Sequence, residues 1–269
     1  MYIESKVNDR VKNIVKLRDK SAREKNGLFF FEGAHMLEEY LRYGHTPDSV
    51  FVCEKSLDEY ALVTAGIEKS RLFTVSESVF AKLSTEKSPR GILTISAFLT
   101  NNVVFIDKEP DYKKLTENND NSFIFLDSLR DNGNVGTIIR TAAALGGVSC
   151  VLSSDCADVY SYKTIRATMG TLFSSRIYIT GDLSKAILSV KNSGRRVFAS
   201  TLGKNSLLLD KIELKEGDSF VVGNEGQGVS ERIYKVCDGA VKIPITDAAE
   251  SLNASAAAAI LLWHIRKLK

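Results

Sequence analysis

The stretch FIFLDSLRDNGNVGTIIR, residues 123–140, shows the architecture of the chain most clearly. Its first residues form a continuous apolar run that ends in Asp127, which is typical of a strand buried on both faces of a sheet. The loop that follows contains glycine and polar residues, and Asn134 stands at the N-cap position expected for a helix. Arg140 falls nearly two turns into that helix. A capped helix N-terminus beside an arginine favours an anion or a phosphate, although an ordinary turn between strand and helix explains the same pattern.

On both sides of this stretch, apolar strands alternate with helical patterns. Besides 123–127, we expect strands at 148–153, 176–179, 196–200, 219–222 and 240–245. Helices are expected at 135–145, 163–169, 183–192, 229–236 and 253–267. Such alternation predicts a parallel sheet covered by helices, and these sheets bind ligands at the carboxyl ends of their strands. Residues 122–269 therefore form an α/β domain with its chemistry in the loops after the strands.

Two further loops carry unusual residues. GNEGQG, residues 223–228, follows an apolar strand, and its glycines leave backbone amides and carbonyls open to a ligand. This pattern alone is a weak signal, and it lacks the Lys-Ser/Thr ending of a phosphate-binding loop. IPITDAAESLNAS, residues 243–255, leads into an alanine-rich helix that Ser251 or Asn253 could cap. The small residues 254–259 allow another backbone to pack very closely.

Residues 1–100 form a smaller α/β unit by the same criteria. We expect helices at 8–25, 32–43, 58–65 and 79–83, and strands at 49–53, 72–75 and 92–96. The mostly polar segment 101–121 is expected to be a linker. Residues 1–30 have a net charge of +4, against +3 for the whole chain, so the basic character is local. The helix at 8–25 would expose a basic stripe, which is either a solvated face or a surface for RNA.

Composition excludes several classes of protein. The apolar fraction of 44% and charged fraction of 26% match an ordinary globular protein with a sizeable core. The four cysteines show no CxxC spacing, which argues against a zinc site or a redox dithiol, and we expect no metal. The start MYIESKVNDR has no apolar signal region, and no later run approaches the roughly 20 apolar residues that cross a bilayer. We therefore expect a cytoplasmic protein without a membrane partner.

The three loops occur in an order that resembles the SpoU (TrmH) class of the SPOUT RNA methyltransferases. The matching segments are NVGTIIR (134–140), GNEGQG (223–228) and IPITDAAESLNAS (243–255), with IRATMG (165–170) as a fourth. FFFEGAHML (29–37) and SPRGIL (88–93) resemble the substrate-binding extension of this family. The extension is a small α/β fold similar to certain ribosomal RNA-binding proteins. Asn132 departs from the family pattern, which usually has proline there.

The resemblance implies the fold and the reaction. The fold is a parallel α/β sheet with a C-terminal trefoil knot, an exception to the usual rule of unknotted chains. The reaction transfers the methyl group of S-adenosylmethionine to a ribose 2′-hydroxyl of RNA, and the N-terminal extension favours ribosomal RNA over transfer RNA. The resemblance also implies a homodimer through the knot, with Arg140 or Arg166 acting across the interface.

Roles follow by position in the family motifs. The catalytic set comprises Arg140, Asn134, Glu225, Ser251 and Asn253. The cofactor-binding set comprises Leu202, Gly203, Gly223, Ile243, Leu252 and Asn253, in which Ile243 and Leu252 sandwich the adenine. The RNA-binding set takes Lys12, Lys16, Arg18 and Arg23 from the basic N-terminal segment, and Arg90 and Arg166 from the matching segments.

Arg140 is a poor proton acceptor, because the pKa of a guanidinium lies above about 12. We therefore interpret it as the group that orients the ribose and stabilises developing negative charge. Three alternatives compete with this reading of the chain. They are a non-catalytic RNA-binding protein that keeps the fold, a transfer RNA methyltransferase, and a nucleotide-dependent oxidoreductase. The last lacks both the glycine fingerprint and a suitable histidine, and no GxSxG motif indicates a hydrolase.

Overall fold

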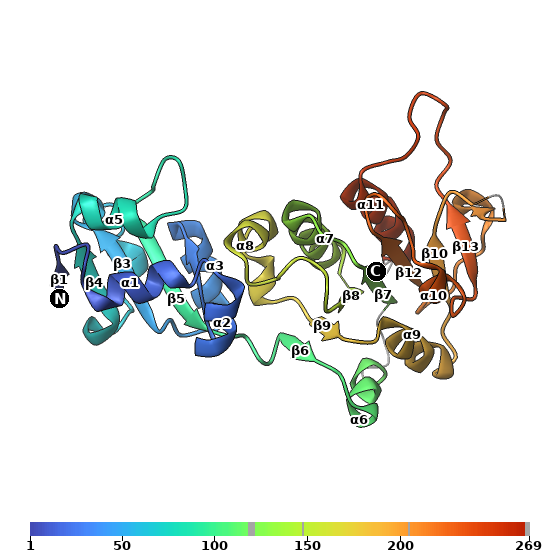
Figure 1. Cartoon of the computed structure of the whole chain (residues 1–269), viewed down its shortest axis with the longest axis horizontal. Coiled ribbons are helices and arrows are strands. Elements are labelled where there is room, and N and C mark those ends of the chain that lie inside the picture. The colour runs from blue at the N-terminus through green and yellow to red at the C-terminus, as the bar shows by residue number, and fades with distance from the viewer. Residues whose placement is uncertain (118–121, 147, 204, 267–269) are drawn as a thin grey trace. The chain divides into compact units, whose positions relative to one another are not determined.

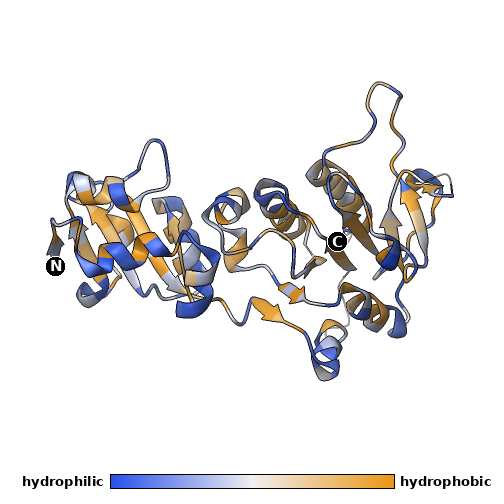
Figure 2. Ribbon diagram, in the orientation of Figure 1, coloured by the Kyte–Doolittle hydropathy of each residue, from blue (hydrophilic) through white to orange (hydrophobic). Residues whose placement is uncertain are grey.

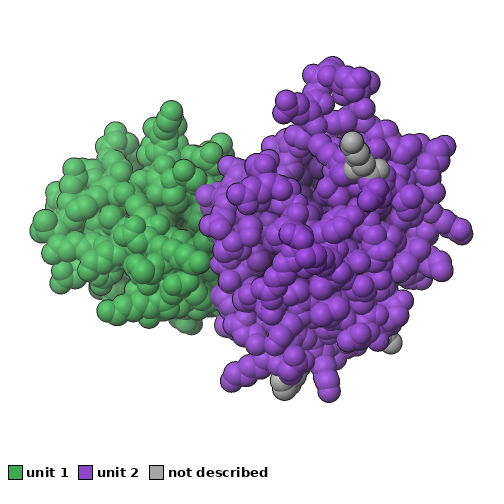
Figure 3. Space-filling view, turned by 45° about the vertical axis from the view of Figure 1, so that its right-hand side comes forward, with its two compact units in different colours: residues 1–99, 158–174 green, residues 100–157, 175–269 purple. Residues whose placement is uncertain are grey.

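The computed structural model describes residues 1–117, 122–146, 148–203 and 205–266. The chain divides into two compact units (Figure 3), and each unit contains two separate stretches of sequence. Unit 1 consists of residues 1–99 and 158–174, and unit 2 consists of residues 100–157 and 175–269.

Unit 2 is built on a parallel sheet with the strand order β11-β13-β10-β12-β7-β8-β9-β6 (Figure 1). All its described strand pairs are parallel. The strands are β6 (Val103–Phe105), β7 (Ser122–Asp127), β8 (Val148–Ser153), β9 (Ile177–Thr180), β10 (Val197–Ser200), β11 (Leu207–Leu208), β12 (Ser219–Gly223) and β13 (Gly239–Lys242). The six predicted strands are confirmed, except that the last one ends at Lys242 and the expected strand residues 243–245 belong to the following loop. Strand β7 is buried along its whole length, as its apolar run indicates.

Helices cover the sheet of unit 2. They are α6 (Glu109–Tyr112), α7 (Asn132–Leu145), α9 (Leu183–Asn192), α10 (Glu231–Tyr234) and α11 (Ala254–Ile265), with short 3-10 helices at Lys113–Leu115 and Leu209–Lys211. Helix α9 packs against the face that carries Phe123, Phe125 and Val221. Helix α11 packs against α7, β7 and β12. Residue 267, the expected end of this last helix, lies outside the described residues.

Unit 1 has a mixed sheet with the strand order β1-β4-β3-β5-β2, in which β2 and β3 are antiparallel to β5 (Figure 1). Its strands are β1 (Tyr2–Ile3), β2 (Leu28–Glu32), β3 (Ser49–Cys53), β4 (Leu72–Val75) and β5 (Ile92–Ala97). Its helices are α1 (Asp9–Lys16), α2 (Lys20–Asn26), α3 (Ala34–Arg42), α4 (Ala61–Thr64), α5 (Glu77–Leu83) and α8 (Tyr162–Thr168), with 3-10 helices at Glu54–Ser56, Lys69–Arg71 and Thr171–Phe173. Apolar residues concentrate on the strands of both units (Figure 2).

The prediction of one helix over 8–25 is wrong, because the chain forms α1 and α2 with a break between them. The side chain of Arg23 explains the break. Its guanidinium is 3% exposed and donates to the carbonyl oxygens of Leu17 and Arg18, both at 2.8 Å. These carbonyls are therefore satisfied by a side chain where a continuous helix would use backbone amides. The same guanidinium forms an ion pair with Asp158.

The predicted domain boundaries differ from the structure in two places. Segment 101–121 is not a plain linker, because β6 pairs with β9 and Ile106, Tyr112 and Leu115 are buried in the core of unit 2. The apolar patch of this segment is only long enough for a short edge strand, which periodicity does not separate from a loop. Residues 118–121 lie outside the described residues.

The second difference concerns residues 158–174, which follow β8 in sequence but pack within unit 1. The ring of Phe173 is 5.0 Å from that of Phe31 and 5.1 Å from that of Tyr40, and Tyr160 stacks on Phe98 at 4.2 Å. The hydrophobic core of unit 1 therefore depends on a segment that comes from the middle of unit 2 in the sequence. Among the described residues, no helix is long and apolar enough to cross a membrane.

We predict that Phe173→Ala lowers the free energy of unfolding of unit 1 by about 3–5 kcal/mol, the usual cost of removing a buried phenylalanine side chain. The chain has a single tryptophan, Trp263 in α11, so its fluorescence reports the unfolding of unit 2. Circular dichroism reports both units. In urea, the variant should shift part of the dichroism transition and leave the fluorescence transition in place. Ile187→Ala, in the core of unit 2, should shift the fluorescence transition. A fluorescence shift in Phe173→Ala would contradict the assignment of 158–174 to unit 1.

Candidate functional site at the carboxyl ends of the strands

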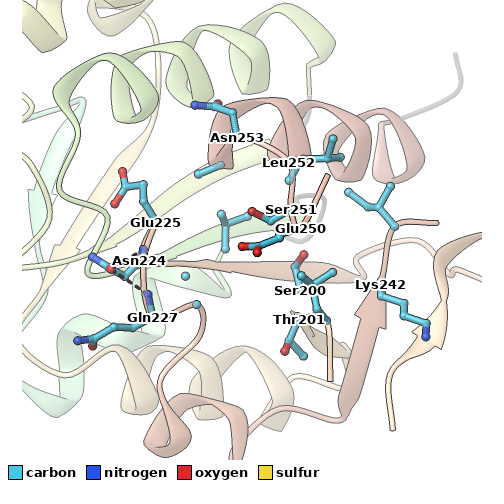
Figure 4. Close-up of a pocket in the computed structure, with 18 of the residues that line it drawn as sticks. Ser200, Thr201, Asn224, Glu225, Gln227, Lys242, Glu250, Ser251, Leu252 and Asn253 are labelled. Atoms are coloured by element: carbon cyan, nitrogen blue, oxygen red, sulfur yellow. Dashed lines mark hydrogen bonds between the residues drawn. The ribbon is translucent and has the colours of Figure 1, made fainter. Parts of the chain in front are cut away.

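A cavity of about 550 Å³ lies where β10, β12 and β13 end (Figure 4). Three loops form its walls, and each begins at the carboxyl end of one strand. The lining residues are Ser200, Thr201, Leu202, Val222, Gly223, Asn224, Glu225, Gly226, Gln227, Gly228, Lys242, Ile243, Ile245, Glu250, Ser251, Leu252, Asn253, Ala254 and Ala257. This is the edge at which a parallel α/β sheet binds ligands.

The cavity brings together most of the residues that the sequence motifs indicated. Leu202, Gly223, Ile243, Leu252 and Asn253 of the predicted cofactor set line it, as do Glu225 and Ser251 of the predicted catalytic set. Gly203 is not among the described lining residues, although its amide donates to Thr201 Oγ1 at 3.3 Å beside the wall.

The loop 223–228 closes on itself very tightly. The amide of Asn224 donates to the carbonyl of Gly228 at 3.0 Å, and the amide of Gly228 donates back at 2.9 Å. A Cβ atom on Gly223 would lie 2.1 Å from the carbonyl carbon of Gly228 and 2.1 Å from the nitrogen of Val229. Because both colliding atoms belong to the backbone, only glycine fits at position 223.

Glu225 holds the first motif in place. Its carboxylate accepts hydrogen bonds from the amides of Arg130 at 3.3 Å and Asp131 at 3.1 Å, and from Asn134 Nδ2 at 3.1 Å. Burial raises the pKa of this carboxyl, but these hydrogen bonds outweigh burial, so the net pKa lies below its ordinary value. Glu225 is therefore ionised at neutral pH and serves as a hydrogen-bond acceptor for the loop 130–134.

The prediction that Asn134 caps α7 is wrong, because Asp131 is the N-cap and its Oδ1 accepts the amide of Asn134 at 2.7 Å. Asn134 lies about one turn further along α7 and is buried, and its side chain bonds to residues of other loops. Its Oδ1 accepts Nδ2 of Asn253 at 3.0 Å, while its own Nδ2 donates to Glu225. Asn253 in turn caps α11 through the amides of Ser255 and Ala256, so of the two expected candidates, Ser251 and Asn253, the structure selects Asn253.

Asn132, which stands where the family usually has proline, is the first residue of α7. A proline at this position gives up no helical hydrogen bond, since the first amides of a helix lack an intrahelical partner. The substitution therefore leaves the start of the helix intact, and Asp131 supplies the cap.

Arg140 and Arg166 do not line the cavity of their own chain. Arg140 is exposed on α7, and none of the described residues forms a hydrogen bond or an ion pair with its guanidinium. Arg166, on α8 in unit 1, donates through Nη1 to both carboxylate oxygens of Glu86, at 2.8 and 2.7 Å. The guanidinium of Arg166 is therefore engaged by Glu86 within unit 1, whereas that of Arg140 can contact a ligand.

The predicted RNA-binding residues of unit 1 differ in availability. The prediction that Arg23 binds RNA is wrong, because its side chain is buried and forms an ion pair with Asp158. The Arg18 guanidinium donates to the carbonyls of Lys82, Leu83 and Ser84, at the end of α5. Lys16 and Arg90 are exposed, and Lys12 pairs with Asp9 at 3.2 Å on the surface.

Several polar lining residues were not singled out from the sequence. They are Ser200, Thr201, Gln227, Lys242 and Glu250. Only their position in the sequence could have indicated them, because Ser200 ends a predicted strand and Thr201 follows it, which places both at the ligand-binding edge of the sheet. Within the described part of the chain, no cluster of His, Cys, Asp and Glu side chains is arranged to hold a metal ion.

Comparison with known proteins agrees with this geometry. Residues 121–263 match the model of the SpoU rRNA Methylase family, and residues 8–94 match an MRM3-like substrate binding domain. The 23S rRNA (guanosine(2553)-2′-O)-methyltransferase RlmP of Bacillus subtilis is 31% identical over 264 residues, which cover 98% of each chain.

Solved structures resemble the whole chain. A crystal structure of an AdoMet-bound rRNA methyltransferase from Sinorhizobium meliloti has a TM-score of 0.82 at 25% identity, covering 99% of this chain and 97% of that one. A crystal structure of an RNA 2′-O ribose methyltransferase has a TM-score of 0.81 at 27% identity and covers 98% of each chain.

We predict that Gly223→Ala destabilises unit 2 by about 3 kcal/mol, the upper end of the cost of overpacking, because the clash is with backbone that cannot step aside. The measurement is chemical unfolding followed by Trp263 fluorescence. Gly226→Ala is the matched control, since its Cβ would meet only Asn224 Oδ1 at 3.7 Å. Equal stability of the two variants would refute the assigned role of Gly223.

A second prediction concerns the pH dependence that Glu225 contributes. Its pKa is lowered in the folded protein, so the stabilisation is complete above the unfolded pKa and is lost as the pH falls through the folded pKa. The difference in unfolding free energy between wild type and Glu225→Gln should be largest near neutral pH and shrink below about pH 4.5, the ordinary value. Fluorescence of Trp263 in urea at a series of pH values measures it. A difference that stays constant down to pH 3 would contradict this role.

Proposed function

The chain belongs to the SpoU rRNA methylase family, and on this premise we propose that it transfers the methyl group of S-adenosylmethionine to a ribose 2′-hydroxyl of ribosomal RNA. The observation that carries the proposal is that Asn134 of the first motif forms hydrogen bonds with Glu225 of the second and Asn253 of the third, both of which line one cavity. The relatives and structures named above support both the reaction and the class of RNA.

The cavity suits S-adenosylmethionine in size and chemistry. Its volume of about 550 Å³ lies within the range of about 300–1,000 Å³ typical of small-molecule sites. Ile243 and Leu252 offer apolar walls for the adenine, and the loop at Gly223 presents backbone groups without side-chain bulk. Bound there, the cofactor supplies a methyl group on a positively charged sulfur, which is a good leaving group.

The protein's own contribution is to orient the ribose and stabilise charge. A ribose hydroxyl is a weak acid, so its oxygen needs electrostatic help as it attacks the methyl carbon and releases its proton to water. We assign that help to Arg140, which is permanently charged and has no partner among the described residues. Glu225 is an unsuitable base, because three hydrogen bonds already occupy its carboxylate and keep its pKa low. Its role is to fix the loop that leads into α7.

We further propose a homodimer in which Arg140 serves the cavity of the partner subunit. Arg140 is exposed and lies outside the lining of its own cavity. Helix α11 packs against α7, which carries Arg140, and α11 also carries Trp263, an aromatic side chain that is 53% exposed. We also propose the trefoil knot, supported by the return of α11 to β7 and β12 in the middle of the sheet.

Unit 1 is proposed to hold the RNA, supported by the match of residues 8–94 to a substrate binding domain. Lys16 and Arg90 are exposed and can contact RNA. The ion pair between Lys12 and Asp9 lies on the surface, so exchanging Asp9 for an RNA phosphate costs little free energy.

We expect Arg140→Ala to bind S-adenosylmethionine with the affinity of the wild type and to transfer methyl groups at least about 100-fold more slowly, the usual cost of removing one electrostatic stabiliser. The measurements are calorimetric titration with the cofactor and transfer of labelled methyl to 23S rRNA made by transcription, followed by mapping of 2′-O-methylated nucleotides. The guanosine named for the Bacillus relative is the first position to examine. Transfer at the wild-type rate in this variant would exclude the assigned role.

Co-expression distinguishes action across the dimer from action within one chain. Leu252→Trp should fill the cofactor cavity, and it leaves Arg140 intact. If Arg140 acts on the partner subunit, a heterodimer of Arg140→Ala and Leu252→Trp has one complete site and regains activity that neither variant shows alone. If the heterodimer stays inactive while both chains fold, the arrangement across the interface is wrong.

A further inference from the structure

A network of hydrogen bonds that the family motifs do not account for lies directly after β7. Ser128 has a left-handed backbone, with φ of 57°, which is uncommon for a residue other than glycine. Its amide donates to Ser153 Oγ at 2.9 Å, its hydroxyl donates to Asp155 Oδ2 at 2.7 Å, and its carbonyl accepts Nδ2 of Asn224 at 2.8 Å. The Ser128 conformation is thus held from β8 on one side and from the cavity loop on the other.

Arg130 stands at the centre of this network. Its amide donates to Glu225, which lines the cavity, and its Nη2 donates to Asp155 Oδ2 at 2.8 Å. The side chain is nevertheless 63% exposed. A guanidinium has five N–H donors, so one hydrogen bond to Asp155 leaves most of them facing outward. The backbone of Arg130 is therefore fixed to the cofactor cavity while its charged end is presented beside it.

The carboxylate of Asp155 is held in position to bind the guanidinium of Arg130. Ser153 Oγ donates to its Oδ1 at 2.6 Å, and Ser128 and Arg130 share its Oδ2. Burial raises the pKa of Asp155, but these hydrogen bonds and the charge of Arg130 outweigh it and lower the net pKa. The carboxylate thus stays ionised and fixes one edge of the guanidinium.

Stability alone is a poor reason for this arrangement. An ion pair as exposed as this one contributes little to stability, and an unfavourable φ at Ser128 lowers stability. Strained residues that their surroundings hold in place concentrate at functional sites. A fixed guanidinium with free parallel donors matches the geometry of a phosphate.

We propose that Arg130 binds a backbone phosphate of the RNA close to the target ribose, and that Asp155 is the positioning residue that holds its guanidinium. The proposal rests on the proposed function, since it requires RNA at the carboxyl edge of the sheet. It adds a phosphate contact in unit 2 to the RNA-binding surface of unit 1. One phosphate contact next to the reacting nucleotide would fix the position of the 2′-hydroxyl relative to the cofactor.

The test compares Arg130→Ala with Arg176→Ala. Both remove one exposed arginine from unit 2, but Arg176 directly precedes β9, at the amino edge of the sheet, opposite the cavity. Binding of transcribed 23S rRNA is titrated at several salt concentrations, and cofactor binding and thermal stability are measured on the same preparations. Arg130→Ala should weaken RNA binding about tenfold or more, the usual size of a lost hydrogen bond to a charged group. Its plot of log affinity against log salt should become shallower by about 0.7–0.9, the contribution of one phosphate.

Two further variants separate contact from positioning. Arg130→Lys should keep the salt slope of the wild type, because the charge remains. It should bind RNA more weakly than the wild type, because lysine lacks the forked geometry of the guanidinium. Asp155→Asn should likewise keep the slope and raise the KM for RNA with kcat little changed. Both variants should bind the cofactor normally.

The proposal is overturned if Arg130→Ala binds RNA with the affinity and salt slope of Arg176→Ala, which would leave only a surface ion pair. It is also overturned if affinity falls with an unchanged slope, since no phosphate would then be released. Failure of the proposed function gives a different result, because the wild type would then bind RNA without transferring methyl groups to it. If Arg130→Ala proves unstable, Arg130→Lys and Asp155→Asn still test the phosphate contact. A shallower plot of log RNA affinity against log salt in either variant contradicts the proposal.

Discussion

The side chain of Asn134 joins three loops that lie far apart in the sequence. Its amide nitrogen donates to Glu225 in the second motif, and its amide oxygen accepts a hydrogen bond from Asn253 in the third. An asparagine has both a donor and an acceptor at the end of one rigid side chain, so neither aspartate nor leucine of similar size would make both contacts. Asn134 is also buried, and an unsatisfied polar group there would cost about 1–3 kcal/mol.

The cavity at the carboxyl ends of β10, β12 and β13 depends on this contact. Glu225 uses its two oxygens to fix the backbone of residues 130 and 131, and Asn253 uses its oxygen to cap α11. The start of α7, the glycine loop and the start of α11 are thus held in one arrangement before any ligand binds. Preorganisation of this kind reduces the entropy that binding would otherwise cost. The close approach at Gly223 serves the same end, because a tight loop has few other conformations.

The two units are connected through the sequence in a way that simple domain boundaries do not describe. The chain passes from unit 1 to unit 2 after residue 99, returns at 158 and leaves again after 174. Phe173 and Tyr160 complete the aromatic core of unit 1, and Asp158 neutralises the buried Arg23. The segment that carries the fourth family motif is consequently a structural part of unit 1, and Arg166 within it donates hydrogen bonds to Glu86.

Local patterns predicted the regular elements well, because a strand buried on both faces must be apolar along its length. The runs at β7 and β12 are unambiguous for this reason, and the position of the site at the carboxyl edge follows from a parallel sheet. Strand β2, which carries three phenylalanines, was missed because the helical pattern that begins at residue 32 obscured its end. Two-residue and three-residue strands such as β6 are too short to show any period.

The sequence by itself determined the family, the parallel α/β sheet and part of the cavity lining, namely Leu202, Gly223, Glu225, Ile243 and residues 251–253, because each of these depends on chemistry within a few consecutive residues. Only the tertiary structure decided which polar groups meet. Asp131 and not Asn134 caps α7, because Asn134 has better partners in two distant loops. Arg23 is buried and not displayed to RNA, because Asp158, 135 residues later, lies against it. The sequence gives the charge of a side chain, whereas the partner of that side chain depends on segments that only folding brings together.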